Sequence, residues 1–84
     1  MNHCETRGTR HMIQRLQRIK SRILEATTEE QFRANCANLA RELDVTSKTI
    51  QRDIDFMIDQ LGHRIEYVST RYSYRYAEPP APVL

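Results

Sequence analysis

The sequence contains few of the residues that break, kink or cross-link a chain. Its 84 residues include two glycines, three prolines, two cysteines and no tryptophan. All three prolines lie within residues 79–84, a run that can form neither a helix nor the interior of a strand. Cys4 and Cys36 are far apart in the sequence. They therefore form neither a disulfide framework nor a paired metal-binding motif, and they suit a reducing compartment.

Long hydrophobic runs are also absent. A membrane-spanning helix needs about 18 consecutive apolar residues, and no segment of this sequence comes near that length. Residues 1–11 lack the apolar stretch of a secretory signal. We therefore expect a cytoplasmic protein with no membrane partner.

The patterns that support catalysis are missing as well. The sequence has no paired carboxylates, no nucleophile with a nearby base and no glycine-rich phosphate loop, so we do not expect an enzyme. His3, Cys4 and His11 carry metal-binding atoms but lack the spacing of a known metal site. We expect neither a metal nor a cofactor.

The charges, in contrast, are unevenly distributed. Residues 1–52 contain ten lysines and arginines against six acids, whereas residues 53–84 contain three against five. Between Arg7 and Arg22 there are six positive charges and no acid. With 39% hydrophobic and 29% charged residues, the composition is that of one small globular domain. The charge distribution indicates one face suited to an anion.

Helical periodicity predicts a first helix that begins behind Thr9 and ends at about Glu25. Its apolar stripe consists of Met12, Leu16, Ile19 and Ile23. A second helix is expected between Asn35, a good N-cap residue, and Asp44, which tolerates the left-handed conformation of a tight turn. Its apolar side consists of Ala37, Leu39, Ala40 and Leu43.

A third helix is predicted directly after this turn. Val45 is expected to point inward and Thr46 to cap a helix that runs from Ser47 to about Leu61, where Gly62 ends it. The apolar positions of this helix are Ile50, Ile54, Met57, Ile58 and Leu61.

After Gly62 the hydrophobic period changes to two. Residues 64–68 and 72–76 alternate between polar and apolar or aromatic side chains, which predicts an antiparallel hairpin connected by residues 69–71. The expected fold is α+β, mainly α: a winged helix-turn-helix with three helices followed by a two-stranded β-hairpin wing. We divide the chain into a flexible basic N-terminal tail (1–10), this domain (11–78) and the start of a proline-rich linker (79–84).

The outward stripe of the third helix carries the chemistry. It consists of Lys48, Arg52, Asp55 and Asp59, flanked by Thr49 and Gln51. Arginine and lysine pair with guanine, glutamine with adenine, and threonine contacts the thymine methyl. A helix that enters the major groove by its N-terminal end needs its cations first and its acids last. The alternative is a solvated surface on which Arg52 pairs with Asp55.

The run LARELDVTSKTIQRDIDFM from Leu39 to Met57, followed by RIEYV and YSYRYAEP, resembles the N-terminal domain of WYL-type transcriptional regulators. It is more distantly similar to DeoR-type repressors. The resemblance covers about residues 12–79. It differs at Asp44, where relatives commonly have glycine in the turn, and at Ser73, where they usually have glycine at the wing tip. The missing wing glycine predicts a wider loop.

The resemblance implies a bacterial transcriptional regulator that binds double-stranded DNA. The residues implied for base readout are Ser47, Lys48, Thr49, Gln51 and Arg52. It also implies an effector domain after the wing, which we expect to be absent from this chain. We expect a homodimer in the full-length context, because a module this small rarely binds tightly alone.

Phosphate contacts are expected around this helix. Thr46 and Asn38 lie near helix N-termini, which attract phosphate, while Arg10 and Arg71 lie on the N-terminal arm and the wing. Arg15, Arg18 and Arg22 either serve the DNA backbone or face solvent and pair with acids such as Asp53.

Three further interpretations stay open. The four tyrosines of the hairpin cover helix three or stack on bases, and the first is favoured. Phe56 packs under helix one or forms a dimer contact, and packing is favoured. Cys36 is a half-buried core residue or a redox-sensitive thiol that gates DNA binding. The alternative function is a winged-helix protein-interaction module without DNA readout.

Overall fold

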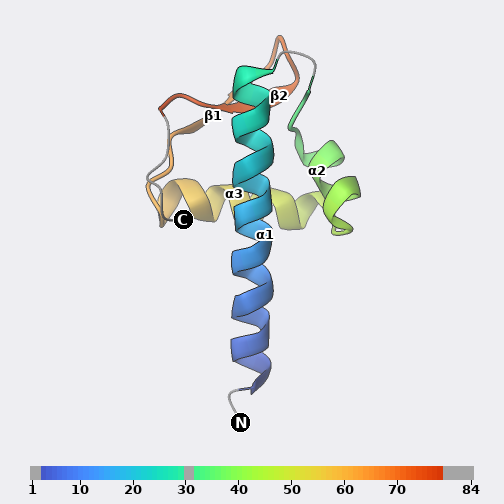
Figure 1. Ribbon diagram of the computed structural model, residues 1–84, viewed down its shortest axis with the longest axis vertical. Helices are drawn as coiled ribbons and strands as arrows, with labels where there is room; N and C mark the ends of the chain where they lie inside the picture. The colour runs from blue at the N-terminus through green and yellow to red at the C-terminus, as the bar shows by residue number, and fades with distance from the viewer. Residues whose placement is uncertain (1–2, 30–31, 79–84) are drawn as a thin grey trace.

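The structure is a computed structural model that describes the backbone of residues 3–29 and 32–78, and side chains from residue 11 onward within these ranges. The elements follow in the order α1 (His3–Thr28), α2 (Cys36–Leu43), α3 (Ser47–Asp59), β1 (Ile65–Val68) and β2 (Ser73–Tyr76). The helix α3 lies across α1, and β2 packs against the C-terminal part of α1 (Figure 1). The predicted mainly α fold of three helices followed by a hairpin is confirmed, and its arrangement is compatible with a winged helix.

The helix α1 is longer than its sequence pattern predicts. It begins at His3, so Thr9 lies inside the helix and is not its N-cap, and it ends at Thr28 rather than Glu25. No proline precedes residue 79, and one glycine, Gly8, costs only about 1 kcal/mol in a helix. The division into tail, domain and linker stays a prediction, and residues 79–84 lie outside the described residues.

Both ends of α2 follow the predicted chemistry. Asn35 caps the helix by accepting a hydrogen bond from the Asn38 amide at 2.9 Å. Asp44 ends it in the left-handed conformation, with φ 57° and ψ 47°. Its backbone N–H and that of Val45 both donate to the Ala40 carbonyl. The aspartate therefore does here what glycine commonly does in such a turn.

The helix α3 begins as predicted and ends early. Thr46 accepts a hydrogen bond from the Thr49 amide at 3.2 Å. The last helical residue is Asp59 rather than Leu61. Gly62 adopts a φ of 71° and lets the His63 N–H reach back to the Met57 carbonyl at 3.0 Å.

The loop of the hairpin is one residue longer than the predicted connection of residues 69–71. Val68 pairs with Ser73, so Ser69–Tyr72 form the whole connection. Tyr72 lies in this loop rather than in the second strand, and it takes the left-handed conformation with φ 53°. That conformation costs a non-glycine residue about 1–2 kcal/mol. Ser73 is buried in β2, so the left-handed position of the wing lies one residue earlier than the glycine comparison indicated.

Backbone contacts fix the hairpin to the helices. The segment before α2 pairs with β2: Tyr74 N donates to Ala34 O at 2.8 Å, and Ala34 N donates to Ser73 Oγ at 2.8 Å. At the other end of β2, Tyr76 N donates to the Thr27 hydroxyl at 2.9 Å. These bonds determine where the hairpin lies relative to α2 and α3.

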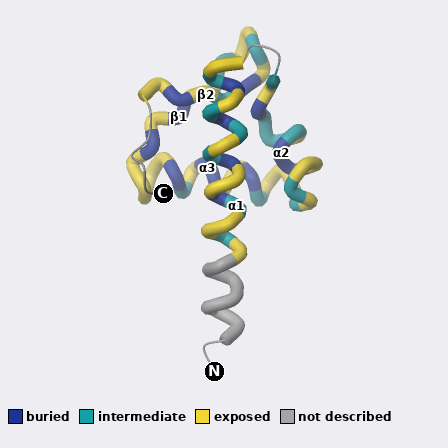
Figure 2. Tube along the Cα trace, in the orientation of Figure 1, coloured by how far each residue is buried: buried dark blue, intermediate teal, exposed yellow. Residues whose placement is uncertain are grey.

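The core lies where the three helices and β2 meet (Figure 2). Its fully buried side chains come from all three helices: Ile19, Ile23, Leu39, Ile50, Ile54 and Met57. The predicted stripe of α1 is confirmed, with Met12 only partly buried, and Phe56 and Val45 pack against the core as expected. Three predicted apolar positions are wrong, because Ala37, Ile58 and Leu61 are exposed.

A buried histidine joins the end of α3 to the sheet. His63 is 7% exposed, and its Nδ1 lies 2.8 Å from the Tyr76 hydroxyl. Burial lowers the pKa of His63, and the positive charge of Lys20 lowers it further. Burial also raises the pKa of Tyr76, so the phenol stays protonated at neutral pH.

We expect the free energy of unfolding to decrease as the pH falls below about 6.5, the pKa of an exposed histidine. In that range the unfolded chain binds a proton that the buried imidazole accepts only at lower pH, so stability is complete above the window. Urea denaturation near pH 7.5 and pH 5.5 measures the difference. The His63→Asn variant keeps a polar atom for Tyr76 and does not titrate. An equally large decrease in that variant would contradict this assignment.

Candidate nucleic-acid interface

The tight turn between α2 and α3 presents the first two turns of α3 to solvent. Lys48 and Arg52 are exposed, and neither forms an ion pair or hydrogen bond with any residue that the structure describes. Asp55 and Asp59 follow on the same stripe and are also exposed. The predicted order, cations first and acids last, therefore lies on an accessible surface.

The alternative interpretation of this stripe is a solvated surface on which Arg52 pairs with Asp55. Among the described residues, Arg52 has no ion pair with Asp55. Asp55 instead accepts a hydrogen bond from Gln51 Nε2 at 3.1 Å. Both cations are thus left available to an external anion.

Gln51 is exposed, but its amide is already engaged. Its Oε1 accepts a hydrogen bond from the Tyr74 hydroxyl at 3.3 Å and a weaker one from the Cys36 thiol at 3.6 Å. Burial, with a contribution from Cys36, raises the pKa of Tyr74 to about 12, so the phenol remains a donor at neutral pH. Base readout by Gln51 requires an exchange of these bonds. Sequence reasoning missed the contact because Tyr74 is distant in the chain.

The remaining residues proposed for base readout differ in access. Ser47 is exposed at the first position of α3, whereas Thr49 is half-buried. The Thr49 hydroxyl lies 3.0 Å from that of Thr46. This pair lies beside the unpaired backbone N–H groups at the start of a helix, where a phosphate is favoured.

The two predicted phosphate residues at helix starts, Thr46 and Asn38, both form hydrogen bonds within the domain. Thr46 caps α3, as described above. Asn38 donates from Nδ2 to the Arg33 carbonyl at 2.9 Å, and its Oδ1 accepts from Arg41 at 3.4 Å. The described bonds use one of the two N–H donors of the Asn38 amide, and Thr46 Oγ1 accepts the Thr49 N–H.

Of the two arginines predicted to contact phosphate, the structure describes the side chain of Arg71 only. The guanidinium of Arg71 turns back from the hairpin loop and donates to the Ala26 carbonyl near the end of α1, at 3.4 Å. Arg71 is half-buried there. The side chain of Arg10 lies outside the described residues.

The arginines of α1 divide into paired and unpaired ones. Arg15 forms a two-pronged ion pair with the buried Asp53 of α3, with Nη2 at 3.1 Å from Oδ1 and Nε also donating. Arg22 contacts Glu25 and Glu42 and stacks 3.8 Å from the Phe32 ring centre. The pairing alternative is therefore confirmed for Arg15.

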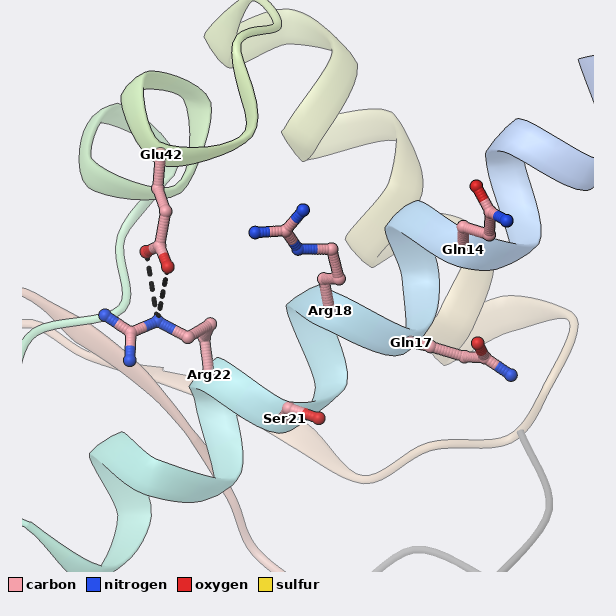
Figure 3. A pocket seen from close by; sticks show the side chains of 6 residues that line it. All are labelled: Gln14, Gln17, Arg18, Ser21, Arg22 and Glu42. Carbon is pink, nitrogen blue, oxygen red and sulfur yellow. Dashed lines mark hydrogen bonds and ion pairs between the residues drawn. The ribbon is translucent and has the colours of Figure 1, made fainter.

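Arg18 is the exception. It projects into a groove between α1 and α2 that is also lined by Gln14, Gln17 and Ser21, and the Arg22–Glu42 ion pair borders this groove (Figure 3). Arg18 is exposed and makes no hydrogen bond or ion pair with the described part of the chain.

The hairpin tyrosines do not all cover the core. Tyr76 is buried and Tyr74 is half-buried, which agrees with the favoured interpretation. Tyr67 and Tyr72 are 48% and 62% exposed, so that interpretation is wrong for these two. Alternation along a strand predicts the side of the sheet but not how far a helix extends over it.

Cys36 is half-buried at the first position of α2, as the core interpretation predicted. Within the ranges that the structure describes, no group of three or more histidine, cysteine or acidic side chains is arranged to hold a metal ion. Across the same ranges, none of the helices has the length and apolar character needed to cross a membrane.

Comparison with known proteins gives no relative. No protein-family model, curated protein or solved structure matches this chain.

Proposed function

We propose that this chain is a winged helix-turn-helix domain that binds duplex DNA through the first two turns of α3. The observation that carries the proposal is the exposed pair Lys48 and Arg52, which has no partner in the described part of the chain. The pair lies at the N-terminal end of a helix capped by Thr46.

The dimensions and the charges support entry by the N-terminal end. Residues 47–52 span about 9 Å along the helix axis at 1.5 Å per residue, which fits a major groove about 12 Å wide. Lys48 and Arg52 then address guanine O6 and N7. Asp55 and Asp59 stay outside the groove, where phosphates do not repel them.

The context of a transcription regulator is a proposal supported by sequence likeness. Residues 39–57 resemble the DNA-binding segment of WYL-type regulators, and the described order of helices and hairpin agrees with that segment. We propose that such a regulator is a homodimer, because two linked reading helices gain affinity that one small domain lacks.

Selection from a library of random duplex DNA tests the proposal. We expect an enriched sequence with guanines at conserved positions, and a palindrome whose half-sites lie about one helical turn apart if two copies bind together. We also expect retention on heparin that decreases with salt. No enrichment, together with flow-through on heparin, would instead support the protein-interaction alternative.

A further inference from the structure

A second surface of interest lies in the angle between α2, α3 and the hairpin. A groove of about 450 Å³ opens there, lined by three tyrosines, Tyr67, Tyr72 and Tyr74, together with Asn35, Cys36 and Gln51. Ala37 also lines the groove, and none of the lining side chains in the described part of the chain is charged. Its volume falls within the range of small-molecule sites, about 300–1,000 Å³.

The tyrosine rings form an ordered aromatic wall. Tyr67 and Tyr74 pack edge to face, with ring centres 5.0 Å apart and an angle of 68° between the planes. The Tyr74 hydroxyl is held by Gln51 at 3.3 Å. Tyr67 and Tyr72 nevertheless leave about half or more of their surface exposed, at 48% and 62%. The described residues therefore leave much of these two rings open to the groove.

The backbone of Tyr72 is held in a conformation that its side chain opposes. Its φ of 53° favours glycine. Burial does not compensate for this cost, because the ring is exposed. The Tyr72 N–H donates to the Ser69 carbonyl at 3.2 Å, and Asn35 Nδ2 donates to the Tyr72 carbonyl at 2.9 Å. The cap residue of α2 therefore also positions this tyrosine at the groove, and a strained exposed aromatic indicates a role in binding.

We propose that this groove stacks an unpaired nucleobase of a DNA strand, next to the duplex segment bound by α3. The uncharged lining disfavours phosphate or an acidic peptide, whereas every base has a π-face that an aromatic ring accepts. Gln51 belongs both to the groove and to the surface of α3, so the two sites are continuous. The inference rests on the proposed function only in that the ligand is DNA.

A ring deletion that suits the backbone gives the sharpest test. Tyr72→Gly removes the π-surface and relieves the positive φ, so the variant is expected to fold with equal or higher thermal stability. Tyr72→Phe keeps the ring and serves as the matched control. The probe is single-stranded oligothymidylate of about eight nucleotides, within the ~4–16 that one binding fold covers.

We expect Tyr72→Gly to weaken oligothymidylate binding about five- to a hundred-fold, and Tyr72→Phe to stay within about two-fold of the parent. The parent should also show quenched tyrosine fluorescence on binding. Tyr67→Ala provides a second deletion on the same wall, with a loss in the same direction. No binding of the probe by the parent, or equal binding by Tyr72→Gly and the parent, would overturn the proposal.

The same variants separate this inference from the proposed function. Suppose that Lys48→Ala and Arg52→Ala weaken duplex binding, while Tyr72→Gly leaves oligothymidylate binding unchanged. Base stacking in the groove is then contradicted, and duplex recognition by α3 is supported. Suppose instead that Tyr72→Gly weakens oligothymidylate binding, while Lys48→Ala and Arg52→Ala leave duplex binding unchanged. Base stacking in the groove is then supported, and duplex recognition by α3 is contradicted.

Discussion

Replacing Arg52 with alanine is expected to weaken binding to the preferred duplex by about 1–3 kcal/mol, which is roughly five- to 150-fold in the dissociation constant. The arginine is exposed and lacks a partner in the described chain, so its removal leaves no protein group unpaired. The loss therefore reports the contact with DNA alone. Lys48→Ala should act in the same direction. Fluorescence anisotropy with the selected duplex measures both.

The matched control removes the same charge elsewhere. Arg64 is exposed just before β1 and lies off the outward stripe of α3. Arg64→Ala should cost little, and equally on every duplex, whereas Arg52→Ala should also relax base preference at one position of the site. Equal losses for the two variants on specific and random duplexes would show that general charge, and not readout by α3, accounts for binding.

Replacing Arg15 with alanine is expected to reduce the free energy of unfolding by about 3 kcal/mol, because it leaves the Asp53 carboxylate buried without its partner. The Asp53 side chain is only 6% exposed, and that of Arg15 is 25% exposed. Hydrogen bonding to Asp53 raises the pKa of Arg15, so the guanidinium stays positively charged at neutral pH. Urea denaturation at neutral pH gives the loss.

A double substitution distinguishes the cost of an orphaned charge from the value of the pair. Arg15→Met combined with Asp53→Leu replaces both partners by apolar side chains and should recover most of the lost stability. Such a result would mean that the pair specifies how α1 crosses α3 more than it adds net stability. A double variant as unstable as Arg15→Ala would contradict this reading.

Local chemistry explains why much of the fold was predictable. The caps Asn35 and Thr46 and the left-handed Asp44 are decided by a few neighbouring atoms, and all three behave as the sequence indicates. The change of period after Gly62 likewise depends on adjacent residues. These features placed α3 and its outward stripe correctly.

The failures come from contacts between distant residues. Ile58 and Leu61 fit the apolar period of α3, but the described residues leave both side chains exposed at the end of that helix. Arg71 turns toward Ala26, which is 45 residues away in the chain. Periodicity does not contain such information. The start of α1 was predicted too late for another reason, because a threonine that can cap a helix can also lie inside one.

At the candidate site, too, local features were predicted and contacts between distant residues were missed. The sequence identified the exposed cations of α3 because a helix stripe follows from spacing alone. It missed the bonds between Gln51 and Tyr74 and the groove of tyrosines, both of which depend on where the hairpin docks. The hairpin docks through Ala34, Ser73 and Thr27, whose role in this docking no local pattern reveals.

The most direct test of the central claim measures the binding of selected and random duplexes at several salt concentrations, for the parent and for a variant that lacks both cations of α3. The logarithm of the association constant should fall linearly with the logarithm of salt concentration, with a slope of about −0.9 per phosphate contacted. In the Lys48→Ala, Arg52→Ala double variant, binding to the selected duplex should drop to the level of random DNA, while the slope changes by no more than about two units. Unchanged discrimination between selected and random duplexes in the double variant would contradict recognition by the first two turns of α3.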